Sequence, residues 1–92
     1  MTDAGLKHLK VLTQLRELRL GDTKVTDAGM KDVKDLTKLT SLDLSLTKLT
    51  DEGAKELKDL KQLTSLNLKF TRVTDAGVKD LQLALPKCKI DR

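Results

Sequence analysis

Cysteine, histidine, proline and aromatic residues are almost absent from this sequence. It has one Cys, one His, one Pro and one Phe, and neither Trp nor Tyr. One Cys cannot form an internal disulfide, and one Cys with one His cannot build a Cys/His zinc site. No apolar run approaches the roughly 20 residues that a membrane-spanning helix needs. A disulfide-rich secreted scaffold and a membrane-spanning chain are therefore excluded, and we expect a reducing, cytoplasmic setting.

What the sequence does contain is typical of one small folded domain. Charged residues make up 35% and hydrophobic residues 38% of the 92 positions, unlike a disordered or a membrane protein. This length accommodates one domain rather than two. Met1 is followed at once by Thr2-Asp3-Ala4-Gly5, without the apolar stretch of a secretory signal, so we expect none. The 18 basic and 14 acidic residues are mixed along the chain and give a net charge of +4.

The strongest feature is an internal repeat. A signature, Thr-Asp-x-Gly, begins at residues 2, 26, 50 and 74, so its spacing is 24 residues each time. Between the signatures lies a second pattern, whose first copy is Leu12, Leu15, Leu18, Leu20, Thr23 and Val25, and which recurs 24 and 48 residues later. We therefore expect a single repeat domain over residues 1–92, divided into 2–25, 26–49, 50–73 and a partial terminal repeat, 74–92.

The two halves of each repeat differ in their hydrophobic period. Leu15-x-x-Leu18-x-Leu20 ends in strict alternation and predicts a short strand. Met30, Val33 and Leu36 have the spacing of one helix face, and charged residues occupy the other face. Each repeat is therefore expected to supply one short helix and one short strand.

The signature predicts how each helix begins. Thr26 is expected to cap its helix by accepting a hydrogen bond from an amide of the first turn. Asp27 places a negative charge at the positive end of the helix dipole. Because glycine lowers helix stability, we interpret Gly29 as the point where a neighbouring helix start lies close. A simple turn glycine is the alternative.

These elements predict a solenoid. One helix and one strand cannot bury their own apolar faces, whereas stacked repeats can. Equal strand directions give a parallel sheet with right-handed crossovers. Strands stack about 4.8 Å apart and packed helices about 8–10 Å apart, so the helical side must fan outward. The expected fold is an α/β solenoid with a short parallel sheet on its concave side and helices on its convex side.

The spacing Leu15-x-x-Leu18-x-Leu20-x-x-Thr23-x-Val25 resembles the leucine-rich repeat. The following Thr26-Asp27-Ala28-Gly29-Met30 is similar to the ribonuclease-inhibitor-like, cysteine-containing subclass of bacterial proteins and F-box substrate receptors. The resemblance implies a right-handed leucine-rich-repeat solenoid, here of about four repeats. The chain departs from the pattern at Thr23, Thr47 and Thr71, where Asn or Cys is usual. No flanking cap module is visible, so we interpret the chain as part of a longer array or as a trimmed scaffold.

The last repeat is irregular. Aligning the segment 85–90 with 15–20 requires deletion of two residues from the preceding helix. Cys88 then takes the inward position of Leu18, and Ile90 that of Leu20. Pro86 is expected to end the helical segment 76–85.

No catalytic, cofactor-binding or metal-binding residues emerge from the sequence. His8, the single imidazole, falls on the charged side of the first helix, and no His is placed to activate a Ser. Cys88 is expected at a core position, where a thiol is inert. The glycines recur at helix starts and form no phosphate-binding loop. We therefore expect neither an enzyme nor a cofactor.

The sheet instead offers outward positions that vary while the structural positions repeat. Such a grid of side chains suits a protein interface. The expected partner-binding residues are Glu17, Arg19, Asp43, Ser45, Leu46, Asn67, Lys69, Phe70 and Lys89. Leu46 and Phe70 share one repeat position and are candidate anchors. The alternative is that both fold down onto the rim of the core.

The leading prediction is a non-enzymatic module that binds a protein partner through the concave sheet. Nucleic-acid binding is suggested by the basic pI of about 9.3, but no aromatic residue lies among the basic ones and acidic residues are mixed throughout. The chain could also be the recognition arm of a larger enzyme or ligase receptor, or a trimmed or designed repeat scaffold without a natural ligand.

Self-association is expected at the N-terminal end of the solenoid. The first repeat has no predecessor, so Ala4, Leu6, Leu9, Leu18 and Leu20 should be partly uncovered. The first strand also has a free edge. We therefore expect a homodimer through this end, either two-fold or by exchange of terminal repeats.

Overall fold

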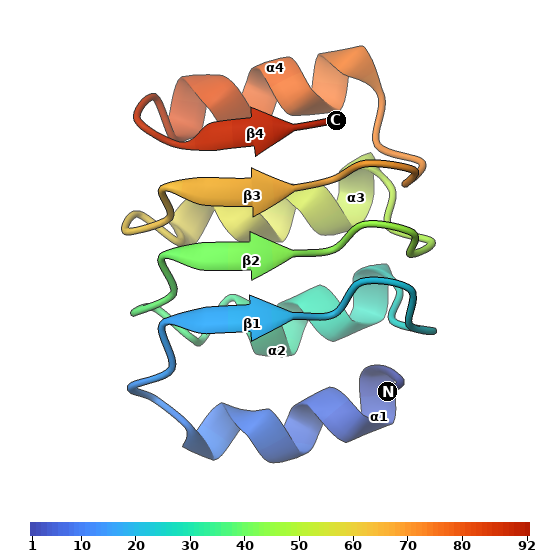
Figure 1. Cartoon of the computed structure of the whole chain (residues 1–92), viewed down its shortest axis with the longest axis vertical. Coiled ribbons are helices and arrows are strands. Elements are labelled where there is room, and N and C mark those ends of the chain that lie inside the picture. Colours follow the sequence, from blue (N-terminus) through green and yellow to red (C-terminus); the bar gives the residue numbers. More distant parts are fainter.

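The computed structural model describes residues 1–92, apart from the side chain of Lys10. Its four strands form one parallel sheet in the chain order β1-β2-β3-β4 (Figure 1). Their bounds are β1 (Glu17–Arg19), β2 (Ser41–Asp43), β3 (Ser65–Asn67) and β4 (Lys89–Asp91). The prediction of a parallel α/β solenoid is confirmed.

The register of the sheet follows the sequence period. Leu18 pairs with Leu42, Leu42 with Leu66 and Leu66 with Ile90, so each step is 24 residues. The side chains of Leu42 and Leu66 are buried, whereas the strand residues on either side of them point to the open face of the sheet. This alternation is what the leucine spacing predicts.

The helical layer mixes α-helix with 3₁₀-helix, written η. Its elements are α1 (Asp3–Leu6), η1 (Lys7–Val11), η2 (Asp27–Gly29), α2 (Met30–Val33), α3 (Asp51–Ala54), η3 (Lys55–Asp59) and α4 (Asp75–Ala84). A 3₁₀ turn is narrower than an α turn and rises about 2.0 Å per residue. Such turns let a few residues extend along the back of the sheet.

The sheet lies on the inner side of the curve. In Figure 1 the helical segments lie behind the strands and spread over a greater height than the strands do. This is the fan that unequal strand and helix spacing requires. The open face of the sheet is therefore concave.

A carboxylate joins each Thr-Asp-x-Gly signature to the next. The three pairs are Asp3–Thr26, Asp27–Thr50 and Asp51–Thr74. In the central pair the Thr50 amide donates to Asp27 Oδ1 (2.7 Å) and the Thr50 hydroxyl donates to Asp27 Oδ2 (2.5 Å). Both bonds are short, as expected of bonds to a charged acceptor. We call this series the Asp–Thr ladder.

The signature glycine makes room for that ladder. A Cβ on Gly53 would collide with Asp27 Oδ1 and would lie 2.9 Å from Asp27 Cα and 2.6 Å from Leu49 Cδ1. Gly29 and Gly77 meet Asp3 and Asp51 in the same way. No glycine has a positive φ, so the simple turn glycine is not the explanation. The predicted close approach is confirmed, and the neighbouring group is a carboxylate.

The predicted Thr caps are only partly present. Thr50 accepts from the Glu52 amide and Thr74 from the Gly77 amide, but Thr26 makes no such bond. The turn after Thr26 is 3₁₀, and the Gly29 amide already donates to the carbonyl of Thr26 (3.1 Å). The prediction for Thr26 was therefore wrong.

The Thr that replaces the usual Asn or Cys bonds within its own repeat. The hydroxyls of Thr23, Thr47 and Thr71 donate to the carbonyls of Leu20, Leu44 and Leu68, at 2.7–2.8 Å. A hydroxyl has one donor, so this bond leaves nothing to donate to a neighbouring repeat. Hydrogen bonds between repeats come instead from the sheet and from the Asp–Thr ladder.

The predicted alignment of the last repeat was wrong. Ile90 pairs with Leu66, so it stands at the Leu18 position and not at that of Leu20. The Cys88 amide donates to Leu85 (3.0 Å) as the Leu63 amide donates to Leu60 (3.1 Å). Cys88 is thus the counterpart of Leu63. Compared with the preceding repeat, the segment from the signature to Cys88 is one residue longer, and the segment from Cys88 to the centre of β4 is one residue shorter. The strands therefore keep their 24-residue spacing.

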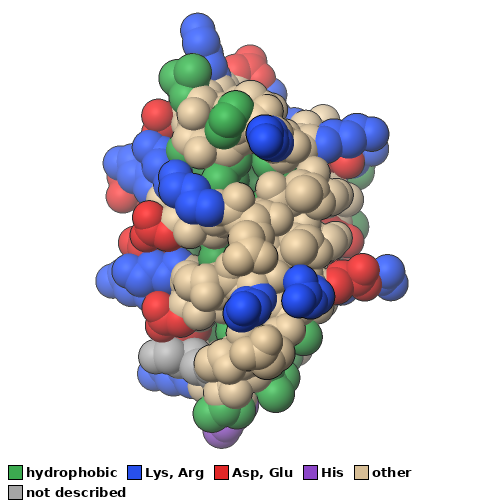
Figure 2. Space-filling model, turned by 90° about the vertical axis from the view of Figure 1, so that its left-hand side faces the viewer, with side chains coloured by type: hydrophobic (Ala, Val, Ile, Leu, Met, Phe, Trp, Pro, Cys, Tyr) green, Lys and Arg blue, Asp and Glu red, His purple; other side chains and the backbone are tan. Residues whose placement is uncertain are grey.

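The N-terminal end is covered differently from the prediction. Leu6 and Leu20 are buried because the following repeat alone suffices to cover them; Leu6 Cδ1, for example, lies against Gly29. Ala4 is exposed, and Leu9 and Leu18 are half-buried. Figure 2 shows hydrophobic side chains gathered at this lower end of the molecule.

The sign of the stability change when Gly53 is replaced tests the Asp–Thr ladder. We expect Gly53→Ala to lower the free energy of unfolding by about 1–3 kcal/mol, because the added Cβ forces the Asp27 backbone to move. If Gly53 were only a helix residue, the same change would stabilise by about 1 kcal/mol. Gly21→Ala is the control, since its nearest contact is the Ser45 hydroxyl at 3.0 Å. Urea unfolding of both variants measures the effect; a Gly53→Ala variant more stable than the parent contradicts the ladder.

The ladder should also make stability depend on acid. The hydroxyl and the amide of Thr74 hold the pKa of Asp51 below its ordinary value of 3.8. A lowered folded-state pKa contributes stability that is present above the unfolded-state pKa and is lost as the pH falls through the folded-state pKa. The Asp51–Thr74 contribution should therefore be complete at neutral pH and should vanish in acid.

A double-mutant cycle isolates this contribution. Asp51→Asn, Thr74→Val and the double variant are unfolded in urea at neutral pH and again near pH 3. We expect a favourable coupling between the two positions at neutral pH and a smaller coupling in acid. The cycle cancels the separate loss of the Thr74 cap. Equal coupling at both pH values would show that the charge of Asp51 is not involved.

Candidate functional site

The open face of the sheet brings most of the predicted contact residues together. One row across the strands consists of Glu17, Ser41, Ser65 and Lys89. The next row consists of Arg19, Asp43, Asn67 and Asp91. The loops after the strands add Ser45, Leu46, Lys69 and Phe70. The predicted residues thus form one continuous surface, which we call the concave surface.

Two of the predicted contact residues are engaged with their own loops. Asp43 Oδ1 accepts from the Ser45 amide (2.9 Å), and Asn67 Oδ1 accepts from the Lys69 amide (3.0 Å). Both side chains are half-buried. They hold the turn that follows each strand. In the first repeat this position is Arg19, whose side chain has no acceptor for a loop amide. Arg19 pairs with Glu17 instead (3.0 Å).

The turn after each strand places one residue in the left-handed region. These residues are Asp22, Leu46 and Phe70, with φ of 54°, 57° and 61°. The Asp22 amide donates to Ser45 (2.8 Å) and the Leu46 amide to Lys69 (2.9 Å), so each of the first two turns is bonded to the turn that follows it. Asp tolerates this conformation, whereas a bulky residue is strained in it. The stack of turns thus holds Leu46 and Phe70 in a costly backbone conformation.

That conformation exposes two large apolar side chains. Phe70 is 77% exposed and Leu46 is 53% exposed. They occupy the same position in neighbouring repeats, so their turns are adjacent. The alternative, in which both fold onto the rim of the core, is wrong. A strained conformation that displays apolar side chains to solvent points to a function for this pair.

The basic residues near the C-terminus are not all free. Arg92 pairs with Asp75 and donates to the carbonyl of Val73. Exposed basic residues instead follow each left-handed turn two positions later: Lys24, Lys48 and Arg72. The recurrence of Lys or Arg at this position is visible in the sequence at the same 24-residue spacing.

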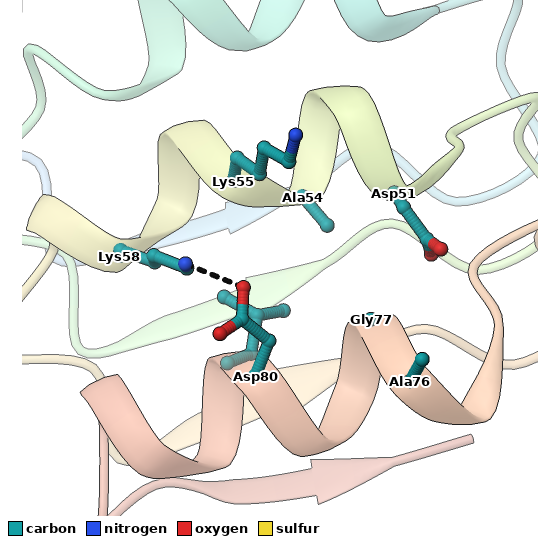
Figure 3. Close-up of a pocket in the computed structure, with 8 residues that line it drawn as sticks. Asp51, Ala54, Lys55, Lys58, Ala76, Gly77 and Asp80 are labelled. Carbon is teal, nitrogen blue, oxygen red and sulfur yellow. Dashed lines mark ion pairs between the residues drawn. The ribbon is translucent and has the colours of Figure 1, made fainter.

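The helical side has a hollow of about 340 Å³ between α3 and α4 (Figure 3). Ala54, Ala76 and Gly77 line it with small side chains. Lys58 and Asp80 face each other there and form an ion pair (2.5 Å). The Asp51 carboxylate at the other end is bonded to Thr74. The polar groups that line the hollow are therefore largely paired within the protein and do not converge on a common point.

The groups with reactive potential lie apart. Cys88 is buried, and burial raises the pKa of its thiol, which keeps it protonated at neutral pH. His8 is exposed on η1. Among the described side chains, no three of His, Cys, Asp or Glu are grouped so as to hold a metal ion. The longest helix that the structure describes, α4, has ten residues. No described helix is long and apolar enough to cross a bilayer.

The geometry therefore defines a curved repeat scaffold with one open sheet face. A model of the family described as "Leucine rich repeat" matches residues 13–73, and the chain belongs to this family. A solved leucine-rich repeat protein of Leptospira interrogans is similar, with a TM-score of 0.62 and 25% identity. The match covers 85% of this chain and 25% of that one, so the chain spans a quarter of that protein's structure. A comparison with curated protein sequences found no match.

The strained turn generates a stability prediction. Leu46→Asn should raise the free energy of unfolding by up to about 1 kcal/mol, because Asn tolerates the left-handed region better than Leu. Leu83→Asn is the matched control: Leu83 is 76% exposed but lies in α4. There the same change should lower stability by about 0.5 kcal/mol through helix propensity. Urea unfolding of both variants decides; a destabilising Leu46→Asn would mean that Leu46 packs against the core.

Proposed function

We propose that this chain is a non-enzymatic module, a single repeat domain of residues 1–92, that binds a protein partner through its concave surface. The observation that carries the proposal is the exposed pair Leu46 and Phe70, held by strained turns beside the open sheet. Aromatic and large apolar side chains dominate interface hot spots. Polar groups surround the pair, as a polar rim surrounds the centre of an interface.

The division between fixed and variable positions supports the proposal. The Asp–Thr ladder, its glycines and the inward leucines recur in register and build the scaffold. The outward positions of the concave surface carry acidic, basic, polar and apolar residues in turn. A scaffold of this kind can fix a partner's orientation, because residues other than the contact residues stabilise the fold.

The family also supports this function, since leucine-rich repeats generally mediate protein–protein interaction. The recurring Thr-Asp-x-Gly signature favours the ribonuclease-inhibitor-like, cysteine-containing subclass. A role as the recognition arm of a larger enzyme or ligase receptor is the second candidate, favoured because the chain spans a quarter of its structural neighbour. The buried free thiol of Cys88 is compatible with the reducing cytoplasm, which we propose as the compartment.

The test replaces the proposed anchor. A partner is isolated with the parent chain as bait, and its dissociation constant is then measured by calorimetry. Phe70→Ala should weaken binding by about thirtyfold, as loss of a hot-spot residue does, with little loss of stability because the side chain lies in solvent. Leu83→Ala, equally exposed but on α4, should leave the affinity unchanged.

A second pair of variants tests the face. Lys31→Glu and Lys79→Glu change exposed residues of α2 and α4 on the helical side. A partner that is insensitive to Phe70→Ala but is lost in these variants binds the convex side, and the proposal fails.

A further inference from the structure

The two outer strands of the sheet each pair on one side only. β1 and β4 stand at opposite ends of the order β1-β2-β3-β4, so each has one edge without a neighbouring strand. Such edges are templates for pairing with another chain. Whether two such edges can pair therefore depends on the side chains at their register positions.

The two edges carry opposite charges at matching positions. If the parallel register continued by one more step, a β1 strand would follow β4 with Glu17 beside Lys89, Leu18 beside Ile90 and Arg19 beside Asp91. Both outward pairs join an acid to a base, and the inward pair is apolar. Opposite charges on neighbouring strands stabilise a sheet, and like charges destabilise it.

We propose that copies of this chain stack head to tail, with the β4 edge of one copy pairing in parallel with the β1 edge of the next. The occupant of each free edge is thus a second copy of the same chain. This contact is independent of the partner-binding function proposed above. It differs from the homodimer predicted above, which was two-fold or formed by exchange of terminal repeats, because the two copies use different edges.

The apolar ends support the stacking. Leu12 is 46% exposed, whereas its counterparts Leu36 and Leu60 are buried. The same contrast separates three further half-buried side chains of the first repeat from their buried counterparts: Leu9, Leu15 and Leu18. These positions are the ones that a preceding repeat would cover. At the other end Ile90 is half-buried, unlike Leu66.

The backbone ladder can be extended in the same direction. In each repeat the amide after the strand donates to the next strand: Leu20 to Asp43 (2.8 Å), Leu44 to Asn67 (2.9 Å) and Leu68 to Asp91 (2.7 Å). The next member of this series is the Arg92 amide donating to the Arg19 carbonyl of a second copy. The stacked contact thus repeats an interface that the chain already forms three times.

The stacked contact does not extend the Asp–Thr ladder. In the helical layer Met1 Sδ lies over Gly5, and Arg92 pairs with Asp75, so the positions of the Asp–Thr ladder are already occupied at both ends. A heterologous contact does not close on itself, so it produces a series of growing species rather than one dimer.

Sedimentation equilibrium over a wide concentration range tests the proposal with the parent chain, Glu17→Lys, Lys89→Glu and the double variant. The parent mass should rise with concentration beyond that of a dimer. Each single variant sets two like charges opposite each other and should weaken association by about tenfold. The double variant restores opposite charges and should associate like the parent, as should an equimolar mixture of the two single variants.

Lys87→Glu is the matched control, because it makes the same charge change on an exposed residue next to β4 but outside the strand register. It should associate like the parent, and circular dichroism should show equal folding in every variant. Phe70→Ala should leave the masses unchanged, so this proposal and the proposed function fail separately.

Three results would overturn the stacking. The first is a parent chain that stays monomeric at every concentration. The second is loss of association in Glu17→Lys but not in Lys89→Glu, which indicates a two-fold contact of β1 with itself. The third is a double variant that does not recover.

Discussion

The signature carboxylates of the first three repeats each accept two hydrogen bonds from the threonine of the next repeat, and the remaining architecture depends on this contact. Asp27 receives both the amide and the hydroxyl of Thr50. Gly53 is the residue that lets the carboxylate approach. One contact of this kind therefore accounts for three of the four signature positions and holds neighbouring helix starts at a fixed distance. A solenoid is stable only as the sum of such neighbour contacts.

The concave surface inherits its rigidity from this stacking. Because the turns are bonded to one another, Leu46 and Phe70 are kept in a left-handed conformation that neither residue favours alone. The strain is local, and the surrounding ladder supports it. The result is a pre-organised pair of apolar side chains on a sheet whose own contact residues are free to vary. Pre-organisation of this kind lowers the entropic cost of binding.

The sequence period also explains how the chain could join copies of itself. A repeat array has no intrinsic end, so its outer strands carry the same pairing surface as its inner ones. In this chain the outward residues of the two outer strands are charged in a complementary way. The proposed binding centres on Leu46 and Phe70, whereas the proposed stacking uses the outer strands β1 and β4 of the same scaffold.

The sequence alone determined the parallel solenoid, its 24-residue register and the inward leucines. The same pattern recurs in every repeat, so an ambiguity in one copy is resolved by the others. It also placed Leu46 and Phe70 at one position. It did not determine that Asp27 serves the next repeat rather than its own helix, because that bond joins residues 23 positions apart. Nor did it align Ile90 correctly, since the helix of the last repeat gains one residue and the approach to β4 loses one, and only pairing with Leu66 fixes the register. Tertiary structure decided these points because they depend on contacts between repeats, which no pattern within one repeat records.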